Sequence, residues 1–297
     1  MTIRSFLFTA LVPVSLLAAA CGDDSGSTGT GGAGGGAGGE GGAGATTTST
    51  TTTTSTTGSG GAGGAAPMDM SKIRVAHLSP DAPAVDVCLY PAGGTPTAPA
   101  VGTPEGLAYP NATGYLDVPS GTYDAAIVLA GADCSDPVAV IEGLPLAADK
   151  AYTAAAVGML AAANGQKAFE VTLLEDNLGA PAAGKAHLRF IHASADAPNV
   201  DVGVLANGAV TDVWSDVAFP TAGAYTPVDA PFTADVGVTV AGDTGVVIGF
   251  TNIDIPEGAI VDVFAIGLLT PANPGQALGA LACINGVGCV QLDETMN

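Results

Sequence analysis

Histidine, serine and aspartate occur at one close spacing in two places of this 297-residue chain. The two sets are His77, Ser79, Asp81 and His192, Ser194, Asp196. These are the residue types of a hydrolase triad, in which histidine takes the serine proton and aspartate orients the histidine. Imidazole and carboxylate together could instead hold a divalent cation. The spacing therefore raises two chemical hypotheses, hydrolysis and metal binding.

The same residues also fit a structural turn, and we favour this third interpretation. A triad needs side chains that converge from separate elements around a cleft, whereas these lie within five residues at a predicted strand end. In Ser-x-Asp-Ala-Pro, the serine and aspartate oxygens accept backbone N–H groups, and Pro83 or Pro198 fixes the backbone angle φ. The histidine would hydrogen-bond to that turn. We therefore predict no catalytic, metal-binding or cofactor-binding residue.

Each set lies within a longer segment that occurs twice. The segment has the form R-x-x-H-x-S-x-D-A-P-x-V-D-V, and it begins at Arg74 and again at Arg189, 115 positions later. Weaker matches downstream pair Tyr109, Pro110 and Tyr115 with Phe219, Pro220 and Tyr225. The repeat predicts two copies of one domain, at residues 72–178 and 184–291.

The elements that position the motif are predicted to be short strands separated by Gly, Pro and Asp turns. The expected strands of the first copy are 73–77, 85–90, 114–118, 122–129, 138–144, 151–158 and 169–174. Those of the second copy are 187–192, 200–205, 224–228, 234–240, 245–252, 259–267 and a weaker one near Val290. Seven short strands per copy indicate a β-sandwich. The predicted fold class is all-β, with two tandem immunoglobulin-like β-sandwich domains after a disordered low-complexity linker.

Strand alternation assigns the faces of the motif. The expected core-facing side chains are Ile73, Val75, His77 and Leu188, Phe190, His192. Arg74 and Arg189 then lie on the opposite face, which we expect to be exposed to solvent. Asp86 and Asp201 in the next strand would pair with these arginines across the strands. Each such solvated pair would contribute about 0–1 kcal/mol.

The motif resembles the opening strand of a bacterial family, the domain of unknown function numbered 4397 (DUF4397). Members of that family begin with a strand like R-x-x-H-x-S-P-D-A-P-x-V-D-V, often occur in tandem, and often sit in exported lipoproteins. The first copy matches closely, whereas the second departs at Ala195, where proline is usual, and at Asn199. The resemblance covers roughly residues 72–290. It implies an all-β fold and an envelope location, and it transfers no catalytic residue.

Four of the five cysteines are predicted to form two disulfides. Cys88 and Cys134 belong to the first copy, and both are missing from the second, as expected of partners. Cys283 and Cys289 bracket a Gly-rich loop near the C-terminus. We therefore predict the pairs Cys88–Cys134 and Cys283–Cys289.

The N-terminal 71 residues predict export and tethering. Residues 1–20 combine an early positive charge with an apolar run that is too short to span a bilayer, which is typical of a signal peptide. Small residues precede Cys21 as in a lipobox, so we expect lipidation of Cys21; the alternative is ordinary cleavage that leaves a free cysteine. Residues 21–71 are rich in Gly, Ala and Thr, which predicts a disordered linker.

The charge balance limits the partners. With 28 acidic and 7 basic residues the net charge is −21, which argues against binding to nucleic acid. We expect an exported protein that is lipid-anchored in the bacterial cell envelope, at the outer membrane or cell surface. Its predicted role is non-enzymatic, structural or interacting. The alternative is an extracellular binding module for a carbohydrate, a protein or a divalent cation.

Overall fold

The computed structural model describes residues 69–96, 106–163, 165–292 and 294. The predicted signal peptide, lipidation site and nearly all of the linker lie outside the described residues. Within them the chain is almost entirely β, with seventeen strands and one short 3₁₀ helix, η1 (Pro274–Gln276). The described part contains no helix with the length and apolar character needed to cross a bilayer. The predicted all-β fold class is confirmed.

The first sandwich consists of two sheets. One sheet has the order β3-β1-β7-β8, with β4 also paired to β1, and the other has the order β2-β5-β6. The strands of the first sheet are β1 (Met70–His77), β3 (Asn111–Ala112), β4 (Leu116–Pro119), β7 (Ala151–Val157) and β8 (Glu170–Asp176). Those of the second are β2 (Val85–Pro91), β5 (Gly121–Leu129) and β6 (Ala139–Leu146). Between the sheets lies a core that includes Ile73, Val75, Ile127, Ile141 and Leu144.

The second sandwich has a similar plan, with five strands in one sheet and four in the other. Its sheets have the orders β12-β9-β15-β16-β17 and β11-β10-β13-β14. The first contains β9 (Lys185–His192), β12 (Thr226–Asp229), β15 (Ile260–Ile266), β16 (Gly279–Ile284) and β17 (Gly288–Leu292). The second contains β10 (Val200–Ala206), β11 (Ala209–Val217), β13 (Phe232–Val240) and β14 (Val246–Ile255). Its core includes Phe190, Val202, Val238 and Phe250.

In both sandwiches the strand that carries the motif lies beside a parallel partner. β1 pairs with β7 and β9 pairs with β15, both in parallel. In register, Arg74 lies opposite Thr153, and Arg189 lies opposite Asp262. The two arginines are thus placed at equivalent points of equivalent sheets.

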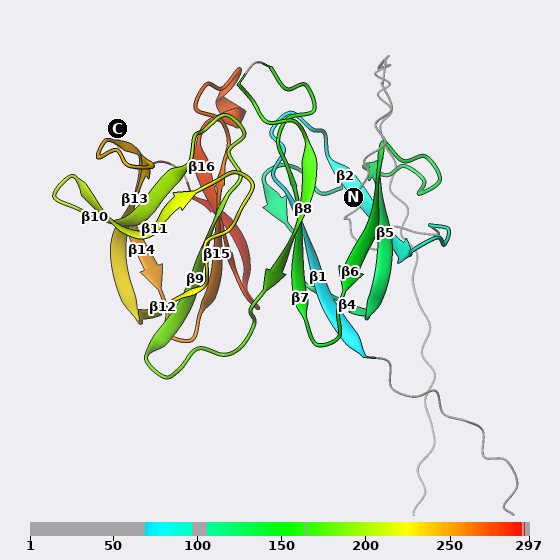
Figure 1. The fold of residues 1–297 in the computed structure, drawn as a ribbon, viewed down its shortest axis with the longest axis horizontal. Coiled ribbons are helices and arrows are strands. Elements are labelled where there is room, and N and C mark those ends of the chain that lie inside the picture. The colour runs from blue at the N-terminus through cyan, green and yellow to red at the C-terminus, as the bar shows by residue number, and fades with distance from the viewer. Residues whose placement is uncertain (1–68, 97–105, 164, 293, 295–297) are drawn as a thin grey trace, which may run out of the picture. The chain divides into compact units, whose positions relative to one another are not determined.

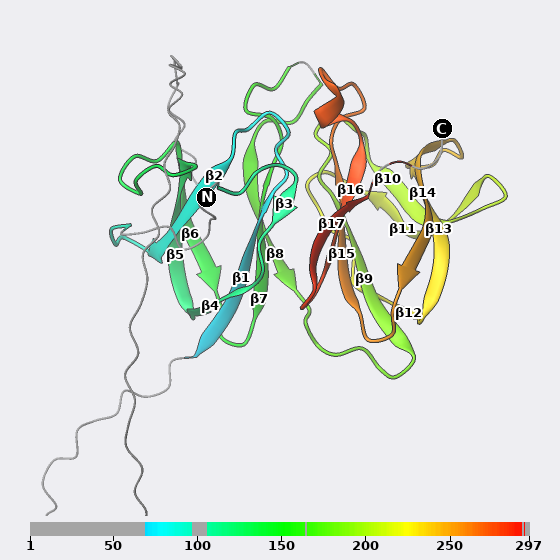
Figure 2. The ribbon, with the colours of Figure 1, turned by 180° about the vertical axis from the view of Figure 1, so that it is seen from behind.

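The sheets that contain β1 and β9 face each other, so that the described strands form four layers (Figure 1). Seen from behind, β16 and β17 continue the sheet beyond β15 (Figure 2). The apolar contact between the two inner sheets is made by Ala76, Leu78, Ala155 and Val157 of the first sandwich and Ile191, Ala193, Phe264, Ile266, Leu281 and Cys283 of the second. We call these residues the inter-sandwich interface. Because of this contact, both faces of β1 and β9 are covered.

Both predicted disulfides are present. Cys88 of β2 bonds to Cys134, which follows β5. Cys283 of β16 bonds to Cys289 of β17, and the two residues lie opposite each other in the strand register. The first disulfide packs on the outer side of the β2-β5-β6 sheet, while Cys283 contributes to the inter-sandwich interface.

Most of the expected strands are observed, and β3, β11 and β16 were not expected. The β11 strand shows why, because most of its side chains are exposed and Asp212, Ser215 and Asp216 interrupt its apolar residues. An edge strand with a solvated surface lacks the alternation on which strand prediction depends.

Candidate functional site

The two histidines of the motif hold the turn that follows their strand. Nε2 of His77 donates to the carbonyl oxygen of Pro83 over 2.9 Å, and Nε2 of His192 donates to that of Pro198 over the same distance. Both rings are buried. The predicted hydrogen bond from each histidine to its turn is therefore confirmed.

The aspartates at motif position eight bind a distant loop. Both oxygens of Asp81 accept backbone N–H groups of the loop after β7, from Leu160 at 2.9 Å and Ala161 at 2.8 Å. Asp196 binds the loop after β15 in the same way, through the N–H groups of Leu269 and Thr270. The sequence predicted that these carboxylates accept backbone amides of their own turn, but the amides belong to the loops that follow the parallel partner strands β7 and β15. Each turn is therefore hydrogen-bonded to the loop of the adjacent strand.

The serines do not occupy the position of a nucleophile. Ser79 is 0% exposed and its Oγ donates to Asp81 over 3.3 Å. Ser194 is 1% exposed, and its Oγ has no hydrogen-bond partner in the described part of the chain. The nitrogen that a triad would direct at serine, Nε2, already binds a proline carbonyl in each copy. The arrangement therefore lacks both the accessible hydroxyl and the available base that acyl transfer requires.

The second acidic position of the motif caps turns within its own sandwich. Asp86 accepts the N–H of Gly131 at 2.8 Å, and Asp201 accepts that of Gly242 at 2.9 Å. Gly131 and Gly242 both have a φ of 76°, a left-handed conformation that glycine adopts without a Cβ penalty. The predicted surface pairs of Asp86 with Arg74 and of Asp201 with Arg189 are therefore wrong.

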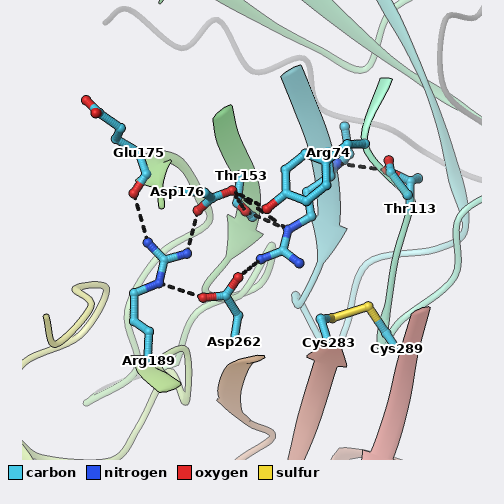
Figure 3. A network of polar contacts seen from close by, with 12 residues as sticks. Arg74, Thr113, Thr153, Glu175, Asp176, Arg189, Asp262, Cys283 and Cys289 are labelled. Carbon is cyan, nitrogen blue, oxygen red and sulfur yellow. Dashed lines mark hydrogen bonds and ion pairs between the residues drawn. A yellow bond between two sulfur atoms is a disulfide. The ribbon is translucent and has the colours of Figure 1, made fainter. Parts of the chain in front are cut away.

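Arg74 points into the space between the two sandwiches rather than into solvent. Only 4% of the residue is exposed. Its Nε donates to Oγ1 of Thr153 over 2.7 Å and lies 4.0 Å from an oxygen of Asp176. Its Nη2 forms an ion pair with Asp262, which belongs to the second sandwich (Figure 3).

Arg189 makes the reciprocal contacts from the second sandwich. Its Nε donates to Asp262 over 2.7 Å, and its Nη2 pairs with Asp176 of the first sandwich. Its Nη1 donates to the backbone carbonyl of Glu175 over 2.9 Å. Figure 3 shows the two guanidinium groups entering from opposite sides, with the two carboxylates between them. We call Arg74, Asp176, Arg189 and Asp262 the central ion cluster.

Two tyrosines at matching positions of the repeat complete the cluster. The hydroxyl of Tyr115 donates to Asp176 over 2.7 Å, and that of Tyr225 donates to Asp262 over 2.8 Å. Each ring also lies against an arginine, with centroid distances of 5.0 Å for Arg74 and 4.4 Å for Arg189. Such cation–π contacts supplement the hydrogen bonds. Two positive and two negative charges thus balance in a buried and well-partnered group.

The electrostatic setting favours the charged arginine and the neutral tyrosines. Burial lowers the pKa of Arg189, but the nearby Asp262 and Asp176 carboxylates outweigh this and raise it overall. Burial, together with the same two carboxylates, raises the pKa of Tyr225 far above its usual value. Burial is also the main cause that raises the pKa of Tyr115. The tyrosines therefore act as hydrogen-bond donors and take no part in proton transfer near neutral pH.

Sequence reasoning missed Asp176 and Asp262 because neither belongs to the repeated motif. Asp262 occupies the register position of Thr153, and Asp176 closes β8, so the two acids are not repeat equivalents. One signal was present: Asp262 interrupts an otherwise apolar strand, Ile260–Ile266. A carboxylate in the middle of such a strand needs a buried partner.

The buried histidines predict a pH dependence of stability. Burial lowers the pKa of both His77 and His192 below 6.5, so the unfolded chain binds protons more readily. The stability that the two neutral histidines contribute is fully present above pH 6.5. It is lost as the pH falls from 6.5 through their lowered pKa values in the folded protein. We expect the free energy of unfolding to fall by up to about 1.4 kcal/mol per pH unit for each histidine.

Urea denaturation between pH 8 and pH 5 measures this dependence. A double variant, His77→Gln with His192→Gln, keeps a donor for each proline carbonyl and cannot gain the imidazole proton. Its stability should change less over the same pH range. A wild-type curve no steeper than that of the double variant would refute the assignment.

The described residues contain no group of three or more His, Cys, Asp or Glu side chains placed to hold a metal ion. The central ion cluster has the acids, but each of its carboxylates already binds arginine and tyrosine donors. This arrangement joins the two sandwiches, because each carboxylate forms hydrogen bonds or ion pairs with residues of the first sandwich and of the second.

Comparisons with known proteins agree with the sequence resemblance. A family model described as "Domain of unknown function (DUF4397)" matches residues 71–203, a range that ends just after the second copy of the motif. No curated protein matches the chain. One similar solved structure is the crystal structure of CBMbc (family CBM26) from Eubacterium rectale Amy13K in complex with maltoheptaose. That likeness covers 76% of this chain and 98% of the other, at 13% identity and a TM-score of 0.20.

Proposed function

We propose that this chain, whose residues 71–203 match the DUF4397 family model, is a non-catalytic protein of the bacterial cell envelope. Its two β-sandwiches would serve as one rigid body in structural or interaction roles. A lipid on Cys21 would anchor the protein at the outer membrane or cell surface, and residues 21–71 would tether the sandwiches to it. Two disulfides are typical of an exported protein in an oxidising compartment.

One observation carries the proposal: the histidines, arginines and aspartates of the repeated motif all bond to other groups of this chain. The histidines bind proline carbonyls, and the aspartates bind backbone amides. The arginines bind buried carboxylates. A residue set used in this way supports a scaffolding role.

The central ion cluster supports the idea of one rigid body. Each arginine bonds to an acid of the other sandwich, and strands β1, β9 and β15, which carry members of the cluster, also contribute to the apolar interface. Sliding one sandwich over the other would separate buried opposite charges, which is costly in a low-dielectric interior. A fixed pair of sandwiches presents its loops in one arrangement, which suits a structural or recognition role.

The test combines two measurements on the full chain expressed in a bacterium with an outer membrane. We expect the chain in the membrane fraction, and no reaction with a fluorophosphonate probe, because Ser79 and Ser194 are buried. The matched variant Cys21→Ser should leave the membrane fraction. Probe labelling at either serine would contradict the non-catalytic role, and unchanged membrane attachment of Cys21→Ser would contradict the lipid anchor.

The alternative function, a binding module for a carbohydrate, a protein or a divalent cation, stays a prediction. A thermal-shift screen with calcium and glycans addresses it, since a ligand that binds the folded state raises the melting temperature.

A further inference from the structure

One sheet edge of the first sandwich has no neighbouring strand in the described part of the chain. β8 ends the order β3-β1-β7-β8, whereas its counterpart β16 is followed by β17 (Figure 2). β8 and β16 are equivalent because each pairs antiparallel with the strand, β7 or β15, that lies beside the motif strand. In register, Val157 lies opposite Glu170 as Ile266 lies opposite Gly279. The first sandwich therefore lacks the strand that covers this edge in the second.

The backbone groups of Val171 and Leu173 point toward this edge. The carbonyl of Ala156 accepts an N–H from the chain just after β1, so the neighbouring Ala155 bonds in the other direction, toward β8. Ala155 lies opposite Thr172, which therefore bonds back to β7. Because successive residues of a strand alternate in direction, Val171 and Leu173 present their N–H and C=O groups outward. No described residue pairs with these groups.

β8 lacks the features that protect other sheet edges from association. Proline interrupts two edge strands, at Pro145 of β6 and Pro227 of β12. β8 contains neither proline nor lysine, and its pairing with β7 shows no register shift. Proline, lysine and bulges are the usual means by which proteins prevent the addition of a strand. A regular edge of this kind can accept an extended peptide through main-chain hydrogen bonds.

The outer edge of β8 also offers apolar contact. Val171 is buried in the core of the first sandwich, and Leu173 packs against that core while half-buried. In the second sandwich, β17 places Val290 opposite Ala282, which is the counterpart of Leu173. A strand added to β8 would likewise set an aliphatic side chain beside Leu173, and a second one beside Val171.

The charges of β8 favour a basic peptide over a second copy of this chain. Two β8 strands paired antiparallel would bring Glu170 of one copy against Glu175 and Asp176 of the other, and opposed like charges are destabilising. The net charge of −21 adds to this repulsion. Glu170 forms no ion pair with another described residue, whereas Glu175 pairs with Lys150. A lysine or arginine opposite Glu170 would supply the missing positive charge.

We propose that the outer edge of β8 binds an extended segment of another protein, in which two aliphatic residues at alternate positions are followed by a basic residue. The segment adds antiparallel to β8 through main-chain hydrogen bonds to Val171 and Leu173, and its side chains give specificity. Its basic residue lies opposite Glu170. The segment is short, because Arg189 already binds the backbone carbonyl of Glu175 at the far end of the edge.

This site rests on the interaction role proposed above and gives that role its partner. Its test is separate from the membrane-fraction and fluorophosphonate measurements, so the failure of one is distinguishable from the failure of the other.

The test uses the blocked hexapeptide Gly-Ala-Val-Gln-Leu-Lys, which is the sequence of β17 with alanine for cysteine and an added lysine. Amide hydrogen exchange of the full chain is followed by NMR with and without this peptide. We expect the N–H groups of Val171 and Leu173 to exchange rapidly in the free chain. They should exchange about tenfold more slowly with the peptide at ten times its dissociation constant. The N–H groups of Ala280 and Ala282, which lie beside β17, are the internal control and should be protected throughout.

Three results would overturn the proposal. Protection of Val171 and Leu173 in the free chain would show that the edge is already covered. Protection that grows with the concentration of the chain would assign the edge to a second copy. Exchange that stays rapid at millimolar peptide would show that the edge does not bind such a segment.

Matched changes separate the main-chain and charge contributions. A peptide with proline in place of valine lacks the N–H that the Leu173 carbonyl accepts, so it should bind about tenfold more weakly. Glu170→Lys should weaken binding of the lysine peptide about two- to fivefold and should strengthen binding of a peptide that ends in glutamate. Glu142→Lys makes the same change at an exposed position of β6 and should leave both affinities unchanged. Equal affinity for the valine and proline peptides, or an unchanged preference in Glu170→Lys, would refute the site.

Discussion

Replacing Asp262 with asparagine should lower the free energy of unfolding by about 3–5 kcal/mol, the cost of leaving a buried charge without its partner. Asp262 is 2% exposed and binds Arg74, Arg189 and Tyr225. Asparagine has nearly the same shape but no charge, so two buried guanidinium groups would face the single carboxylate of Asp176. Urea denaturation followed by circular dichroism measures the loss.

The matched control is Asp229→Asn, which makes the same chemical change at the surface. Asp229 pairs with Lys185 over 2.6 Å, but its side chain is 94% exposed. A solvated ion pair contributes little, so this variant should lose far less stability than Asp262→Asn. Similar losses in the two variants would show that burial of the central ion cluster does not matter for stability.

Removing one charge of the central ion cluster and removing all four should affect stability differently. Substituting all four members by apolar residues of similar size, Met for the arginines and Leu for the acids, removes the buried charges together. Such a replacement of a buried ion cluster is often neutral or stabilising. This variant should therefore be more stable than Asp262→Asn, although it lacks more of the native contacts.

Removing the Cys88–Cys134 disulfide should lower the free energy of unfolding by about 4 kcal/mol. The two cysteines are 46 positions apart, and closing a loop of this length restricts the unfolded chain strongly. The double variant Cys88→Ala with Cys134→Ala is suitable, because both residues are buried and alanine introduces no polar group there. The midpoint of urea denaturation under non-reducing conditions provides the measurement.

The second disulfide supplies the comparison. Cys283 and Cys289 are 6 positions apart, so the same loop-entropy model gives about 2 kcal/mol for their removal. The longer loop should thus be the costlier one to open. If the Cys283→Ala, Cys289→Ala variant loses more, its position at the inter-sandwich interface outweighs the loop length and the entropic explanation fails.

Local patterns were sufficient for several features of this protein. The repeated motif at Arg74 and Arg189 placed β1 and β9 and indicated two sandwiches. Alternating apolar residues and Gly, Pro and Asp turns located most strands, because these signals act over a few neighbouring residues. The absence of both cysteines from the second copy identified the partners Cys88 and Cys134, and the contact of each histidine with its own turn was also within reach of local reasoning.

The surroundings of the same residues depended on packing that no local pattern describes. Alternation correctly placed Arg74 opposite the core of its own sandwich, but it cannot tell whether that opposite face meets water or another sheet. Here it meets β9 and β15, so a side chain expected at the surface lies in a buried ion cluster with Asp176 and Asp262. Likewise, Ser79 and Ser194 occupy the same motif position, yet the hydroxyl of Ser79 bonds to Asp81 whereas that of Ser194 has no partner among the described residues. Short-range periodicity follows from backbone geometry, whereas burial and charge partners follow from which surfaces come together when the chain folds.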